Sequence, residues 1–209
     1  MFIINFFIRP LINQKKQIKM TITNLKNISH FWVMGIMLIY GLLFAEYSYL
    51  LNLKVITIQN VALMTNPIFT YFQSFSFIMT LIIAIVVWLI SSFLFHLFAV
   101  LLGGEANFKD FQKYTGLCYI LPSIGFCVVL VLFNNISFPK ENLEVFFISN
   151  KTLVLINWII NISSMLCFII PIPIIKYLYL VNWLKAVGSV VIPLGSIYLL
   201  GQFFGRYVL

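Results

Sequence analysis

The chain has 209 residues, of which 62% are hydrophobic and 9% are charged, and its mean hydropathy is +1.06. A soluble domain carries about a quarter of its residues as charged side chains, so this composition excludes a soluble fold and indicates a polytopic membrane protein. The net charge of +8 would suggest nucleic acid in a soluble protein. Here the basic residues are expected to set topology and to contact the anionic headgroups of the lipid bilayer, and we expect no nucleic-acid partner.

Residues 1–30 are expected to form a basic segment on the cytoplasmic side. An apolar piece from Phe2 to Ile8 precedes Arg9 and several lysines, whereas a secretory signal places its positive charge before the apolar region. The piece is also too short to span a bilayer. We interpret it as an interfacial anchor, with a frayed hydrophobic start as the alternative.

Residues 31–209 are predicted to form one all-α bundle of about five membrane spans. The first apolar run, residues 31–51, has 21 residues and one charge, Glu46. At about 1.5 Å per residue this length crosses a hydrocarbon core of about 30 Å. Residues 55–74 are rich in Thr, Asn and Gln and are expected to lie outside the lipid. The predicted spans are residues 31–51, 77–102, 114–133, 153–175 and 186–205.

The distribution of Lys and Arg predicts the orientation, because cytoplasmic loops collect them. Of the thirteen basic residues, nine lie in the N-terminal segment and in the loops after the second and fourth spans. We therefore place the N-terminus in the cytoplasm and the C-terminus outside.

Two glycines, Gly103 and Gly104, end the second predicted span and raise the question of a phosphate-binding loop. Such a loop needs a following Lys-Ser/Thr, or a third glycine in a strand-to-helix unit, and the sequence has neither. Glycine is favoured where a helix ends because it accepts the left-handed conformation. The pair is therefore predicted to turn the chain at the cytoplasmic surface.

A short amphipathic helix is predicted between the second and third spans. Asn107, with Asp110 three residues later, resembles a helix N-cap pair, so the helix is expected to begin at Phe108. At helical spacing, one face of this helix is largely apolar and consists of Phe108, Phe111, Tyr114 and Thr115. The basic residues Lys109 and Lys113 lie on the other side. We expect this helix to lie in the cytoplasmic interface and to lead into the third span.

Few reactive groups lie in the predicted spans. Glu46 is expected to reach the outer interface or a neighbouring helix, and His96 is expected to be a hydrogen-bonded histidine of the bundle. Neither HExxH nor GxSxG occurs, and the three cysteines lie in apolar runs without metal-ligand spacing. We expect a protein that is not an enzyme and that has no catalytic residue, metal site or cofactor.

Two groups of residues are predicted to pack helices. Asn157, Asn161 and Ser164 form a polar stripe at i, i+4 and i+7, which should face other helices because lipid offers no hydrogen-bond partner. A water-lined path is the alternative, but a coupled transporter usually also carries intramembrane charge. Gly201 and Gly205 have GxxxG spacing, which favours close packing inside the bundle or against a partner subunit.

The stretch around the glycine pair carries a family resemblance. An apolar helix is followed by Leu102-Gly103-Gly104, Phe108, Tyr119 and Pro122, and the last span is preceded by Trp183-Leu184-Lys185-Ala186. With five spans and a cytoplasmic N-terminus, residues 31–205 resemble the Yip family of Ypt/Rab-interacting membrane proteins. The long soluble N-terminal region of eukaryotic members is missing, and the Ile/Asn/Lys/Phe-rich composition is typical of an AT-rich genome. Both features favour the bacterial branch and the bacterial cell membrane.

The resemblance implies a non-enzymatic membrane scaffold or accessory subunit. Some bacterial relatives resemble accessory subunits of macrolide-exporter-like ABC systems. The expected partner is therefore an integral membrane protein, possibly an ABC-type exporter permease that acts in peptide or toxin export or resistance. The alternative is a stand-alone small transporter or channel. The sequence shows no paired intramembrane charges and no inverted repeat, which favours the accessory subunit.

Overall fold

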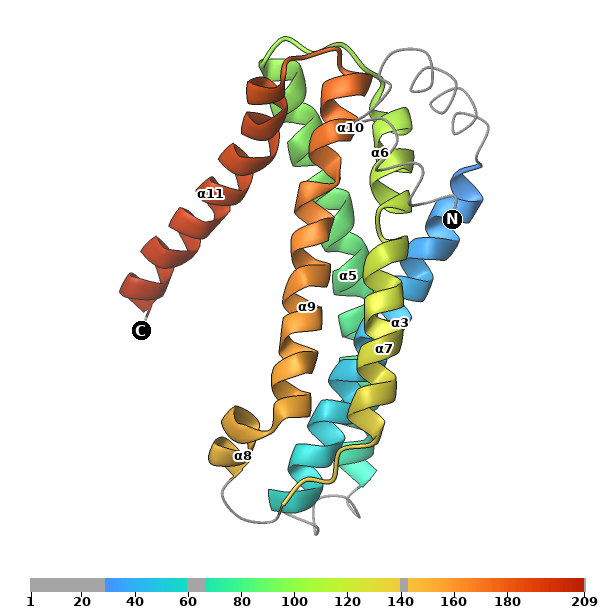
Figure 1. Ribbon diagram of the computed structural model, residues 1–209, viewed down its shortest axis with the longest axis vertical. Coiled ribbons are helices and arrows are strands. Elements are labelled where there is room, and N and C mark those ends of the chain that lie inside the picture. Colours follow the sequence, from blue (N-terminus) through green and yellow to red (C-terminus); the bar gives the residue numbers. More distant parts are fainter. Residues whose placement is uncertain (1–28, 60–66, 140–142, 209) are drawn as a thin grey trace.

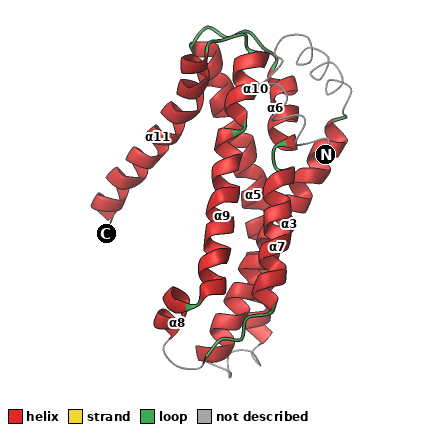
Figure 2. Ribbon diagram, viewed as in Figure 1, coloured by secondary structure: helices red, strands yellow, loops and turns green. Residues whose placement is uncertain are grey.

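The computed structural model describes residues 29–59, 67–139 and 143–208 of the chain, and every regular element in these ranges is an α-helix (Figures 1 and 2). In chain order the helices are α3 (His30–Gln59), α5 (Pro67–Leu101), α6 (Phe108–Leu117), α7 (Ile120–Asn134), α8 (Leu143–Ser149), α9 (Lys151–Ile169), α10 (Pro171–Leu178) and α11 (Trp183–Val208). The predicted N-terminal anchor falls on residues 1–28 and lies outside the described residues.

Within the described residues, four segments are long and apolar enough to cross a membrane, by length and composition: His30–Ile56, Pro67–Leu101, Phe108–Asn134 and Lys151–Leu178. The third and fourth segments are each built from two successive helices, α6 with α7 and α9 with α10 (Figure 1). The predicted all-α class is therefore confirmed, and the four apolar segments are compatible with the predicted multi-pass membrane protein. The described apolar stretch of α11, Trp183–Leu199, is shorter, so a fifth span stays a prediction.

Helix α5 begins at Pro67, well before the span predicted to start near residue 77. Polar side chains in this part satisfy their own hydrogen bonds within the helix. The Ser74 hydroxyl donates to the Thr70 carbonyl at 3.1 Å, and the Thr80 hydroxyl donates to the Ser76 carbonyl at 2.8 Å. The backbone one turn earlier accepts these bonds, so both hydroxyls have a hydrogen-bond partner within α5.

Helix α6 begins at Phe108, the residue at which the sequence predicts a helix to start. The Asn107 side-chain oxygen accepts a hydrogen bond from the Lys109 amide at 2.9 Å, as an N-cap residue does. Phe111 and Tyr114 are buried, because α6 packs against α3, α5 and α10 and runs on into α7 (Figure 1). Its apolar face therefore contacts other helices of the chain, and a position in the membrane interface stays a prediction.

Close helix contacts hold the centre of the bundle. Helix α3 packs along α5 and α7, and α7 packs along α9. A Cβ atom on Gly125 of α7 would collide with the Ser163 hydroxyl of α9, and a Cβ on Gly41 of α3 would lie 2.7 Å from Leu81 Cδ1 of α5. Small residues at these crossings let the backbones approach, which is a main source of association energy between helices in lipid.

Candidate functional site

The glycine pair lies at one end of the bundle, where α5 ends, α6 begins and α10 turns into α11 (Figure 1). Gly103 has a φ of +88°, in the left-handed region that glycine adopts readily. Its amide donates to the Val100 carbonyl at 2.9 Å, and the Gly104 amide donates to the Ala99 carbonyl at 2.9 Å. These two bonds form a Schellman C-cap, so both amides are already used. The predicted chain-turning role is confirmed, and neither amide is free for a phosphate.

Gly104 also allows a side chain from another helix to approach. A Cβ atom there would lie 2.7 Å from the Cβ of Tyr179, which follows α10 and is 2% exposed. The Tyr179 hydroxyl is hydrogen-bonded to His96 Nδ1 of α5 at 2.5 Å. Burial raises the pKa of Tyr179 above its ordinary value, so the hydroxyl keeps its proton. The expectation that His96 has a hydrogen-bond partner in the bundle is confirmed.

Aromatic rings complete this junction. Tyr179 meets Phe111 edge-to-face at a centroid distance of 5.5 Å, and His96 lies 5.1 Å from the ring of Phe108. Each such aromatic pair stabilises the fold by about 0.5–1.5 kcal/mol, in addition to the stabilisation from the apolar area that it buries. Of the motif residues, the junction therefore brings together Gly103, Gly104 and Phe108, and it fixes the ends of four helices relative to one another.

Tyr119 and Pro122 lie elsewhere, at the joint between α6 and α7. Tyr119 is 8% exposed and packs with Met37 of α3 and Trp88 of α5. Pro122, in the first turn of α7, is also buried. Proline is tolerated there because its missing N–H has no intrahelical acceptor in the first turn. These two residues belong to the bundle core and not to the glycine junction.

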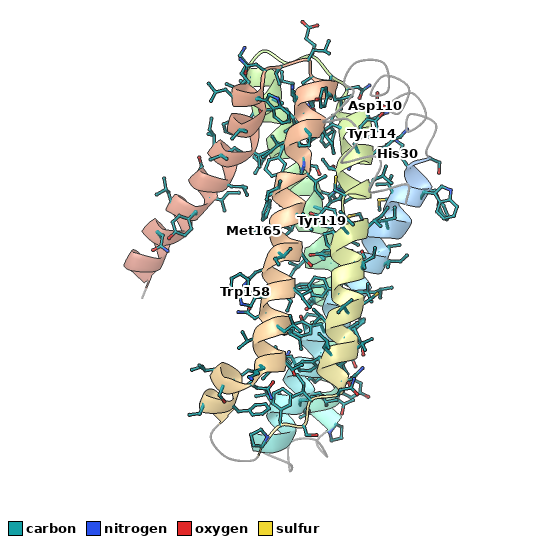
Figure 3. The ribbon with its side chains drawn as sticks, viewed as in Figure 1. His30, Asp110, Tyr114, Tyr119, Trp158 and Met165 are labelled. Carbon is teal, nitrogen blue, oxygen red and sulfur yellow. The ribbon has the colours of Figure 1, made fainter. Side chains whose placement is uncertain are left out.

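The polar stripe of the fourth predicted span lies on α9, and no described helix covers it. Asn157, Asn161 and Ser164 are all exposed, whereas the neighbouring Ser163 is 5% exposed and faces α7. Trp158 and Met165 lie on the side of α9 that faces α11 (Figure 3), and they are 63% and 62% exposed. The helix that the stripe was predicted to meet is therefore not among those described.

Among the side chains of α11 that the structure describes, those in its first half contact the bundle. Ala186 is fully buried and Pro193 is buried, but Ile197, one turn further along the same face, is 52% exposed. Helix α11 packs against α5 and α10, and beyond this point it runs away from the bundle (Figure 1). Helical spacing places Gly201 and Gly205 along the same row as Pro193 and Ile197, and the surroundings of these two glycines lie outside the described residues.

Lys54 follows the first predicted span, which ends at residue 51, but the structure places it within α3, where it caps the C-terminal end of α7. Its ammonium group donates to the carbonyls of Phe133 at 2.7 Å and Ile136 at 2.9 Å, and it lies 4.8 Å from the Phe133 ring centroid. A cation is favourable at these terminal carbonyls because the helix C-terminus carries partial negative charge. No local pattern around Lys54 could predict an acceptor 79 residues away.

Glu46 is half-buried in α3. Among the described residues, no group of three or more His, Cys, Asp or Glu side chains could hold a metal ion.

Comparison with known proteins found no matching family model, no matching curated protein and no matching solved structure. The resemblance to the Yip family therefore rests on the residues of this sequence alone and stays a prediction.

Proposed function

We propose that this chain is a non-enzymatic, Yip-type accessory protein of the bacterial cell membrane. It packs against another integral membrane protein and supports it. From the family resemblance, that partner is an ABC-type exporter permease in peptide or toxin export or resistance. The glycine junction then serves as the rigid end from which α11 projects.

The observation that carries this proposal is the partial docking of α11. Its docked face is buried as far as Pro193 and is exposed one turn later at Ile197. The row continues with the GxxxG pair, Gly201 and Gly205, and small residues in such a pair let a second helix approach closely. Because α11 has left its own bundle at this point (Figure 1), a helix of another membrane protein is the expected neighbour.

The same proposal includes a fifth span and an orientation. Helix α11 has 26 residues, which at about 1.5 Å each reach about 39 Å, enough for a hydrocarbon core of about 30 Å. Five spans place the two termini on opposite sides of the membrane, and the distribution of Lys and Arg favours a cytoplasmic N-terminus and a C-terminus outside. Helix α6 and the N-terminal anchor then lie at the cytoplasmic interface near anionic headgroups.

The alternative is a stand-alone transporter or channel, in which the α9 stripe would line a water path. A path through the bundle needs polar side chains that point inward between the helices. Asn157, Asn161 and Ser164 instead lie on the exposed surface of α9. The buried face of that helix carries Leu153, Ile156 and Cys167, with Ser163 as its one polar hydroxyl. This arrangement favours a protein contact over a path.

The test is a pull-down in mild detergent, followed by quantitative mass spectrometry. The wild-type chain is compared with Gly201→Ile/Gly205→Ile and with the control Gly35→Ile, because a Cβ on Gly35 would meet no atom within 4 Å. We expect the wild type and the control to recover an exporter permease, and the double variant to lose it without a change in its melting temperature. A double variant that melts lower and still recovers the same proteins would contradict the proposal, because the pair would then pack inside the chain.

A further inference from the structure

The exposed polar stripe belongs to a longer row on α9. Val154, Asn157, Asn161, Ser164 and Phe168 follow one another at alternating steps of three and four residues, and we refer to these five residues as the α9 seam. Such spacing is the heptad pattern by which two helices pack along a left-handed supercoil. Helices in membrane bundles commonly cross in this way, at about 20°.

The centre of the α9 seam has no partner among the described residues. Asn157, Asn161 and Ser164 are exposed within a segment that can cross the membrane, and none of them forms a side-chain hydrogen bond to the rest of the described chain. Lipid tails can neither donate nor accept hydrogen bonds. Polar side chains at membrane depth therefore gain by meeting a second polar helix.

We propose that the α9 seam pairs with the α9 seam of a second copy of this chain, about a two-fold axis along the membrane normal. Both copies enter the membrane with the same orientation, so their α9 helices run parallel, and a two-fold axis places each seam residue opposite its own copy. The carboxamide of Asn and the hydroxyl of Ser both donate and accept hydrogen bonds. A row of these residues is therefore complementary to itself.

The surroundings of the α9 seam are compatible with this pairing. The contacts of α9 within the chain are mainly with α7, with α8 and α10 beside its two ends. Phe168, at one end of the seam, is half-buried against the core cluster at the glycine junction, so the pairing surface is the part from Val154 to Ser164. Trp158 and Met165 lie beside the seam and are largely exposed (Figure 3), so they supply apolar surface at its edge. The pairing is independent of the proposed exporter contact, because that contact uses α11.

The first experiment is oxidative cross-linking in liposomes of bacterial phospholipid, with the exposed native cysteine removed by Cys127→Ser. Asn161→Cys is compared with Ile162→Cys, because Ile162 is also exposed, at 53%, but lies on a different face of α9. We expect a disulfide-linked dimer from Asn161→Cys and little from Ile162→Cys. Equal cross-linking at both positions, or no dimer at position 161, would overturn the proposal.

The second experiment measures dimer dissociation by energy transfer between labelled copies as the liposomes are diluted with lipid. Asn157→Leu/Asn161→Leu replaces polar side chains with apolar ones that lipid accepts, so the monomer stays folded. We expect the dimer to weaken on the order of tenfold, from the strength typical of hydrogen bonds between membrane helices. An unchanged dissociation constant would show that the α9 seam does not pair. Neither result depends on whether an exporter permease binds α11.

Discussion

Substitution of Gly104 is the sharpest test of the glycine junction. In Gly104→Ala, the new Cβ would lie 2.7 Å from Tyr179 Cβ and 2.9 Å from the Ala99 carbonyl oxygen. Both neighbours resist displacement, since Ala99 is in the last turn of α5 and Tyr179 is held by His96. Overpacking of this kind typically lowers the free energy of unfolding by about 1–3 kcal/mol. Gly104→Val adds two methyl groups at the same place and should lower it further.

Two other glycines separate the effect of crowding from that of backbone conformation. In Gly103→Ala, the new Cβ would lie 3.6 Å from the flexible Lys185 ammonium group and would not be crowded. The φ of +88° is unfavourable for alanine, so the free energy of unfolding should fall by roughly 1–2 kcal/mol. Gly35→Ala meets no atom within 4 Å and should leave stability unchanged or raise it, because alanine favours helix over glycine by about 1 kcal/mol.

The assay is thermal unfolding of the detergent-purified variants, read as the loss of the monodisperse size-exclusion peak. We expect Gly104→Val to melt lowest, Gly103→Ala and Gly104→Ala to melt below the wild type, and Gly35→Ala to melt at or above it. If Gly104→Val melted like the wild type, the close approach of Tyr179 would be refuted. Nucleotide binding that disappears in this variant would refute the chain-turning role itself.

Two further variants test single hydrogen bonds in the same melting assay. Lys54→Met keeps an apolar stem but loses the donors to the Phe133 and Ile136 carbonyls. It should lower the free energy of unfolding by about 1.5–3 kcal/mol, with partial recovery in Lys54→Arg, and an unchanged melt would show that water replaces the ammonium group. Tyr179→Phe keeps the aromatic ring but loses the hydrogen bond to His96. It should lower the free energy of unfolding by about 1 kcal/mol. In a background that already carries His96→Phe, Tyr179→Phe should lower the melting temperature no further, because the bond is already absent. A further drop of the same size would show that the bond to His96 is not the cause.

Features encoded by neighbouring residues could be predicted from the sequence. The turn at Gly103 and the N-cap at Asn107 depend on backbone conformation and on bonds within a few residues, so their residue types indicate them directly. The all-α membrane class followed from composition and apolar run length. The early start of α5 differs from the prediction because the Thr, Asn and Gln content of residues 55–74 indicated a segment outside the lipid, although the Ser74 hydroxyl bonds to the Thr70 carbonyl of its own helix.

Features that depend on contacts between distant helices could not be predicted. Tyr179 lies 83 residues from His96 in the sequence, and nothing near either residue identifies the other. The polarity and spacing of Asn157 and Asn161 predicted a helix contact, but only the arrangement of α7, α9 and α11 shows that this face is uncovered. Likewise, the sequence of α11 gives no sign that its docked face ends after Pro193. Ile197 is exposed because of where α11 lies relative to the other helices.

Membrane topology tests the account most directly, because a partly docked fifth span requires α11 to cross the bilayer. Single cysteines are introduced by Lys16→Cys, Lys109→Cys, Lys140→Cys and Arg206→Cys in a background with Cys127→Ser, and intact cells are treated with a membrane-impermeant thiol reagent. We expect positions 140 and 206 to react, and positions 16 and 109 to react only after the membrane is permeabilised. Protection of position 206 alongside reaction at position 140 would show that α11 does not cross, and labelling of position 109 in intact cells would contradict the predicted orientation.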